Sequence, residues 1–80
     1  MPADLSKKAQ QKEIHLKWAR QNPLLMANRI RENQTFDFIA QRLERTKYDT
    51  TINESDRQQR INQIIQDYYR LVDLIEAAGF

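Results

Sequence analysis

The chain contains no cysteine, only one glycine and only two prolines in 80 residues. Without cysteine there can be no disulfide bond and no thiolate metal ligand, which excludes a disulfide-stapled secreted scaffold. Phosphate-binding loops need several glycines close together, so this class of nucleotide site is excluded as well. The scarcity of helix-breaking residues leaves a chain that can form long, uninterrupted helices.

Long apolar runs are also missing. No segment approaches the roughly 20 apolar residues of a membrane-spanning helix. The residues after Met1 read PADLSKKAQQKE and offer no apolar core for a signal peptide. We therefore expect a soluble, cytoplasmic protein without membrane contact. At this length the chain forms one domain, residues 1–80, and buries only about 60–65% of its unfolded surface.

What the sequence does contain favours an all-α fold. Hydrophobic residues make up 40% of the chain and charged residues 30%, with many of the glutamines, glutamates, lysines, arginines and leucines that favour helices. Apolar residues recur at helical spacing in several segments. These features predict a small three- to four-helix bundle with a long, capped C-terminal helix.

The first predicted helix runs from about Asp4 or Ser6 to Gln21. Residues 1–12 form a basic arm with little to bury, and we expect this arm to fray unless a partner orders it. Farther along, Ile14 and Trp18 are four residues apart and should stack on one face. We expect Trp18 to be substantially buried and to pin this helix to the rest of the protein.

A second predicted helix begins at Pro23, with Asn22 as its N-cap. The polar residues 33–35 favour a break, with Thr35 capping a further helix, over one continuous helix across residues 23–47. The stretch KYDTTINE, residues 47–54, reads as a loop, and its two largest apolar side chains, Tyr48 and Ile52, should pack against the bundle.

The last predicted helix has the clearest limits. Ser55 and Gln58 form a capping box at its start, and Gly79 with Phe80 has the pattern of a Schellman cap at its end. Its apolar stripe includes a heptad-like seam. This seam is either the core of the bundle or a homodimer contact; its residues are Ile61, Ile65, Tyr68, Val72 and Ile75.

Catalytic chemistry is poorly represented. His15 is the only histidine, so a transition-metal site within one chain is not expected, and the sequence places no nucleophile beside it. The carboxylates of the last helix lie on its polar side. We therefore predict a protein that is not an enzyme, with no cofactor, metal or small-molecule ligand.

Charge is unevenly distributed along the chain. Residues 1–33 carry seven basic and three acidic side chains, and residues 34–80 carry six basic and eight acidic ones. A basic front half suits an acidic macromolecular partner. We expect a homodimeric interaction or regulatory protein that binds such a partner through its first helix. In the tyrosine pair of the last helix, one ring should face the core and the other should lie at its rim. The candidate residues are Lys7, Lys8, Lys12, Lys17, Arg20, Tyr69 and Arg70.

The alternative is a DNA- or RNA-binding regulator that uses the same basic face. Lysines and arginines would contact phosphates, with Gln10 and Gln11 near base edges. The segment FIAQRL, residues 38–43, resembles the first helix of a helix-turn-helix, but the ERTKYD that follows lacks the glycine of the expected turn.

Overall fold

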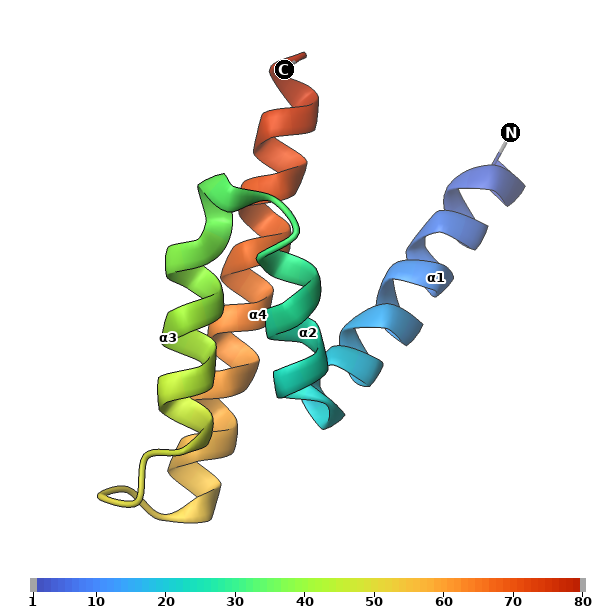
Figure 1. Cartoon of the computed structure of the whole chain (residues 1–80). Helices are drawn as coiled ribbons and strands as arrows, with labels where there is room; N and C mark the ends of the chain where they lie inside the picture. Colours follow the sequence, from blue (N-terminus) through green and yellow to red (C-terminus); the bar gives the residue numbers. More distant parts are fainter. Residues whose placement is uncertain (1, 80) are drawn as a thin grey trace.

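The computed structural model of the chain describes the backbone of residues 2–79 and the side chains of residues 9–79. This part of the chain is all-α, without a strand, and confirms the predicted class of fold (Figure 1). In chain order, the elements are α1 (Pro2–Gln21), α2 (Pro23–Ile30), the 3-10 turn η1 (Gln34–Phe36), α3 (Asp37–Lys47) and α4 (Glu54–Ala77).

Three of the helices, α2, α3 and α4, lie side by side, whereas α1 leaves the group at an angle (Figure 1). The N-terminal half of α1 stands apart from the C-terminal end of α4, and its other half contacts α4 and α2. The C-terminal end of α4 extends beyond the turn that joins α2 to α3. The protein is therefore a three-helix body with a fourth helix attached over part of its length.

The core lies between α2, α3 and the first half of α4. Ala27 and Ala40 are completely buried, and their small side chains let the helices approach closely. Among the side chains of residues 9–21, helix α1 contributes a single fully buried one, that of Ala19. The remaining core residues are Met26, Ile30, Phe36, Ile39, Leu43, Ile61 and Ile65.

A bidentate ion pair fastens α2 to α3. Both terminal nitrogens of Arg31 donate to the Glu44 carboxylate, one of them at 3.1 Å, and Asp37 lies 3.5 Å from the Nε of the same arginine. The hydrogen bond from Arg31 holds the pKa of Glu44 below its usual range and raises the pKa of Arg31. This geometry fixes the angle between two helices that are joined by a short turn.

The boundaries between the first three helices lie where the sequence predicts them, but the residues that cap these helices differ from the prediction. Helix α1 ends at Gln21 and Pro23 opens α2, as predicted. The Asn22 side chain, however, does not cap α2 and instead donates to the Trp18 carbonyl at 2.9 Å. The break at residues 33–35 is confirmed, but Asn33 rather than Thr35 provides the cap, with Oδ1 accepting from the Thr35 N–H.

Helix α4 begins two residues earlier than the sequence predicts. Its N-cap is Asn53, whose Oδ1 accepts from the Asp56 N–H at 2.8 Å, so the Ser55 capping box is wrong. The Arg57 side chain holds the preceding loop here, donating to the carbonyls of Asp49 and Ile52. That contact places Asn53 at the start of the helix. Asparagine and serine are equally good N-cap residues.

The far end of α4 has the glycine that the sequence indicated. Helix α4 ends at Ala77, and Gly79 has a φ of +81°, a left-handed conformation that side chains rarely adopt. Its N–H donates to the Glu76 carbonyl at 3.1 Å. The predicted closure of Phe80 onto Ile75 lies outside the described residues.

One predicted packing contact is wrong. Tyr48 is 68% exposed instead of lying against the bundle, and its loop is held by Arg57, which donates to the Asp49 carbonyl. Ile14 is 69% exposed, yet it lines one open hollow together with Trp18, so the predicted shared face of α1 is confirmed.

Candidate functional site

The predicted seam of α4 is divided by the fold. Its first two members, Ile61 and Ile65, are buried in the core, whereas the last three, Tyr68, Val72 and Ile75, are half-buried. Thus the first part of the seam serves the chain's own core, as one of the two interpretations required. The second part, called here the distal seam and formed by Tyr68, Val72 and Ile75, is only partly covered.

An open apolar hollow lies over the distal seam. Phe36 forms the wall opposite the distal seam. Its ring meets the Tyr68 ring edge to face, with 5.5 Å between the two ring centroids. Asn33, Thr35 and Glu76 form a polar border. Burial of the ring raises the pKa of Tyr68. The arrangement has the apolar centre and polar rim of a protein contact surface.

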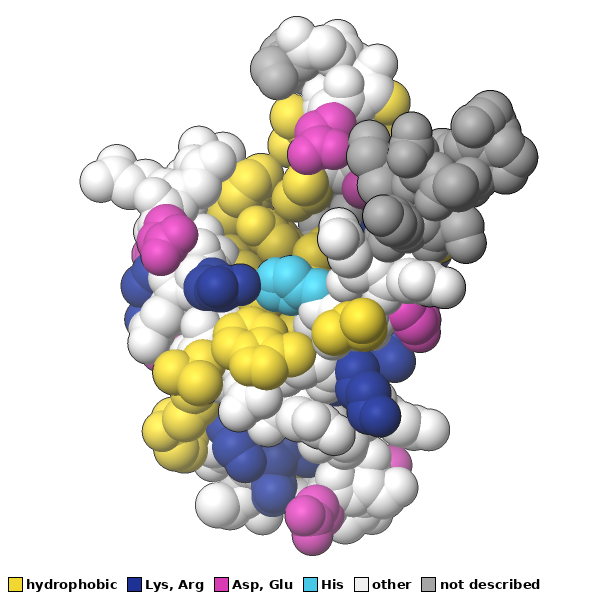
Figure 2. Space-filling view, turned by 90° about the vertical axis from the view of Figure 1, so that its right-hand side faces the viewer, with side chains coloured by type: hydrophobic (Ala, Val, Ile, Leu, Met, Phe, Trp, Pro, Cys, Tyr) yellow, Lys and Arg dark blue, Asp and Glu magenta, His cyan; other side chains and the backbone are white. Residues whose placement is uncertain are grey.

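On the face beside this hollow, four side chains from α1, α2 and α4 contact one another. They form what is called here the histidine cluster, which consists of His15, Trp18, Arg29 and Tyr69. His15 Nδ1 lies 2.8 Å from the Tyr69 hydroxyl, and its Nε2 lies 3.1 Å from Nη1 of Arg29. The Arg29 guanidinium also lies over the Trp18 ring, 5.1 Å from its centroid. Figure 2 shows hydrophobic side chains on both sides of the single histidine on this face.

The partners of His15 determine which ring nitrogen donates. A guanidinium has only donors, so Nε2 accepts from Arg29, and Nδ1 donates to the Tyr69 hydroxyl. Burial, the larger cause, and the adjacent Tyr68 raise the pKa of Tyr69, so its hydroxyl stays protonated. These bonds link α1, α2 and α4 to one another.

The cluster provides no reactive nucleophile. No serine, threonine or cysteine lies among its hydrogen-bond partners, and a tyrosine with a raised pKa is a weak nucleophile. Within residues 9–79, no three histidine, cysteine or acidic side chains gather closely enough to hold a metal ion. No helix in this part of the chain is long and apolar enough to cross a membrane.

The predicted partner-binding residues of α1 are separated by the structure. Lys12 forms an ion pair with Asp73 of α4. Lys17 is exposed, and Arg20 is half-buried, with its Nε enclosed and without a hydrogen-bond partner among the described residues. The side chains of Lys7 and Lys8 lie outside the described residues.

The two candidates on α4 differ as well. Tyr69 belongs to the histidine cluster and faces α1, whereas Arg70 is exposed. Sequence reasoning missed the cluster because its members come from three helices. The one local signal is that His15 and Trp18, three residues apart, share a side of α1.

The outer side of α1 carries a regular exposed stripe. Its members alternate spacings of three and four, so they lie along one line of the helix. The Ile14 side chain is in the middle, with cationic and amide side chains before and after it. This outer stripe consists of Gln10, Ile14, Lys17 and Gln21, all exposed.

No family model matches the sequence, and neither the curated proteins nor the solved structures yield a significant match.

Proposed function

We propose that the protein is a non-enzymatic interaction protein with a regulatory role, which binds an acidic macromolecular partner through α1. The observation that carries the proposal is the outer stripe. An isoleucine that is 69% exposed, beside Lys17 and two amides, gives a helix face with an apolar anchor, one cation and two hydrogen-bonding side chains. This combination suits a protein surface, where apolar contact adds affinity and charge adds selectivity.

The way in which α1 is attached supports the same proposal. Among the described side chains, the helix is held to the body on one side, by Ala19, the histidine cluster, the Lys12–Asp73 ion pair and the Gln58 side chain, which donates to the Arg20 carbonyl at 3.1 Å. Its outer side is therefore free to contact a partner without any rearrangement of the core. Two chains joined at the distal seam would present two such helices.

Self-association through the distal seam forms part of the proposal. A second copy placed there would cover Val72 and Ile75, which no described part of the chain buries completely. We expect sedimentation equilibrium at micromolar concentration to give twice the 9.6 kDa chain mass, and the Val72→Glu variant to remain monomeric and helical. A single 9.6 kDa species at every concentration would rule out the dimer.

Nucleic-acid binding is the second candidate, favoured by the lysines and arginines of α1. The helix-turn-helix resemblance does not support it, because α3 and α4 lie side by side and are joined by a loop (Figure 1). Binding to DNA or RNA would weaken log-linearly with salt concentration as counterions are released. Binding to a protein through an apolar anchor would depend less on salt.

Changing Lys12 and Lys17 together to glutamine is expected to weaken partner binding several-fold. Each exposed charge contributes well under about 1 kcal/mol to stability, so the fold should persist. The matched control changes Arg45 and Lys47 of α3, two exposed cations away from α1. Arg20 is left intact because its half-buried side chain would confuse folding with binding.

The readout is retention of partners from an extract of the native host, with and without nuclease. We expect the wild type and the α3 control to retain a protein that the α1 variant loses, whether or not nuclease is added. Loss of the same partner on nuclease treatment would favour the nucleic-acid function. Equal retention by all three proteins would place the contact away from α1, with Arg70 as the next residue to change.

A further inference from the structure

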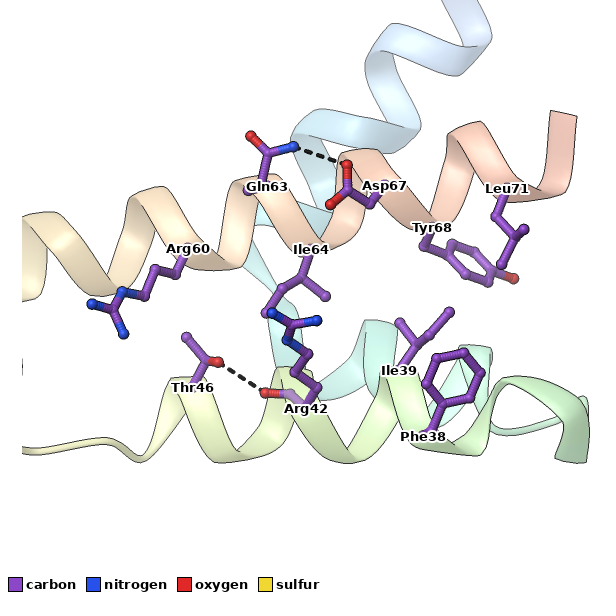
Figure 3. Close-up of a pocket in the computed structure, with 10 residues that line it drawn as sticks. All are labelled: Phe38, Ile39, Arg42, Thr46, Arg60, Gln63, Ile64, Asp67, Tyr68 and Leu71. Carbon is purple, nitrogen blue, oxygen red and sulfur yellow. Dashed lines mark hydrogen bonds between the residues drawn. The ribbon is translucent and has the colours of Figure 1, made fainter. Parts of the chain in front are cut away.

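A second open surface lies between α3 and α4, away from the histidine cluster. Figure 3 shows this groove, which has a volume of about 360 Å³. One wall comes from α3 and the other from α4, and the two helices run along its length. Its lining residues are Phe38, Ile39, Arg42, Thr46, Arg60, Gln63, Ile64, Asp67, Tyr68 and Leu71.

One end of the groove is apolar. Phe38 is 63% exposed there, and Figure 3 shows it near Ile39, with Tyr68 and Leu71 on the opposite wall. An exposed phenylalanine beside half-buried aliphatic side chains leaves a contiguous apolar area in contact with water. Such an area becomes favourable to cover when a partner brings apolar side chains of its own.

The other end is cationic. Arg42 reaches from α3 toward α4, and Arg60 lies farther along α4 (Figure 3). Among residues 9–79, neither arginine lies within ion-pair distance of a carboxylate. Two carboxylates lie close by. Asp67 lines the groove and accepts from Gln63 at 2.9 Å, and the hydrogen bonds of Thr51, followed by the charges of Arg60 and Arg57, lower the pKa of Asp49. With two arginines against the single carboxylate of Asp67, the lining is cationic overall.

We propose that this groove binds an acidic amphipathic helix of another protein. Its apolar side chains would cover Phe38 at one end, and its carboxylates would pair with Arg42 and Arg60 at the other. A helix fits because a groove between two adjacent helices accepts a third one by ordinary side-chain packing. The backbone groups of α3 and α4 are used within the helices, which leaves no edge for an extended strand.

A second copy of the chain fits this groove less well. The outer stripe of α1 would bring Lys17 toward two arginines, and like charges repel. The C-terminal part of α4 offers the exposed Leu74, but its neighbour Asp73 already pairs with Lys12. Charge complementarity therefore favours a different, acidic chain. The proposal uses no residue of α1 and is independent of the partner contact proposed for that helix, although the groove shares Tyr68 with the distal seam.

The test uses a synthetic helical peptide with two leucines four residues apart, followed one turn later by two glutamates. It is titrated into the full-length, nitrogen-15-labelled protein and compared with a peptide in which lysines replace the glutamates. We expect submillimolar binding that shifts amide signals between residues 38 and 46 and between 60 and 71. The lysine peptide should bind at least about tenfold more weakly.

Three variants locate the binding site. Phe38→Ala and the double variant R42Q/R60Q should each weaken the acidic peptide about tenfold or more, and both keep the fold because the side chains are exposed. The Lys12 and Lys17 double variant should bind it as the wild type does. This last variant matters because an acidic peptide could also be attracted to α1.

The opposite results would overturn the proposal. Absence of binding by the acidic peptide at about 1 mM would do so, as would shifts confined to α1 or loss of binding in the Lys12 and Lys17 variant. Concentration-dependent shifts of the groove amides without peptide would show instead that a second copy occupies the groove. Absence of binding without shifts on α1 would overturn the groove alone, whereas shifts confined to α1 would place the acidic contact on the helix named in the function proposed above. The two proposals therefore fail separately.

Discussion

Replacing Ile65 by alanine is expected to lower the free energy of unfolding by about 2–4 kcal/mol. The Ile65 side chain is completely buried among residues of α2, α3 and α4. Its removal leaves a cavity that three packed helices cannot easily close. Small domains have only about 5–15 kcal/mol of stability in total, so this single change should remove a large fraction of it.

The matched control is Leu74→Ala on the same helix. Leu74 is 62% exposed, and its truncation should cost less than about 1 kcal/mol. Val72→Ala, at a half-buried position, should fall between the two. Urea unfolding followed by circular dichroism gives the three values. If Leu74→Ala or Val72→Ala destabilised the monomer as strongly as Ile65→Ala, the distal part of α4 would have to be buried.

The apolar spacing of the last helix predicted its existence but not the extent of its burial. The same pattern continues from Ile61 to Ile75, while exposure changes along it from buried to half-buried. The reason is the length of the neighbouring helices, since α4 extends beyond the turn that joins α2 and α3 (Figure 1). Spacing within one segment carries no information about where its neighbours end.

Some helix boundaries could be predicted from the sequence, and others could not. The break before Pro23 and the glycine at position 79 follow from backbone constraints that a single residue imposes. The cap of α4 depends on a choice between Asn53 and Ser55, which are equally good caps by type. Contacts of Arg57 with the preceding loop decide that choice, and they are formed only in the folded chain.

The histidine cluster could not be predicted from the sequence. Its hydrogen bonds join His15 to Arg29, 14 residues away, and to Tyr69, 54 residues away. No local pattern relates these positions. The groove could not be predicted either, because Phe38 was read only as part of a resemblance to a DNA-binding helix, and its exposure depends on the angle at which α3 meets α4.

The three open surfaces have different chemistry. The outer stripe of α1 has one cation and two amides around an isoleucine, the distal seam is apolar with a polar border, and the α3–α4 groove is apolar at one end and cationic at the other. These differences are the physical basis for the separate partners proposed above.

Replacing Trp18 by alanine is expected to release α1 while α2, α3 and α4 remain folded. The sequence suggested a core tryptophan, for which the cost would be about 3–5 kcal/mol. The structure shows a half-buried ring that contacts His15 edge to face and lies beneath the Arg29 guanidinium. We therefore expect a smaller loss, about 2 kcal/mol, and a local one, because Ala19 is the only fully buried residue among the described side chains of α1.

Hydrogen exchange of individual amides separates local from global loss. In Trp18→Ala, the amides of residues 14–21 should exchange much faster, while those around Leu43 and Ile65 keep nearly the wild-type rate. The control is Ile14→Ala, which removes an exposed side chain from the same helix and should leave both sets of rates unchanged. An equal loss of protection throughout the bundle would show that α1 is an integral part of the core, and that the body formed by α2, α3 and α4 does not hold together without it.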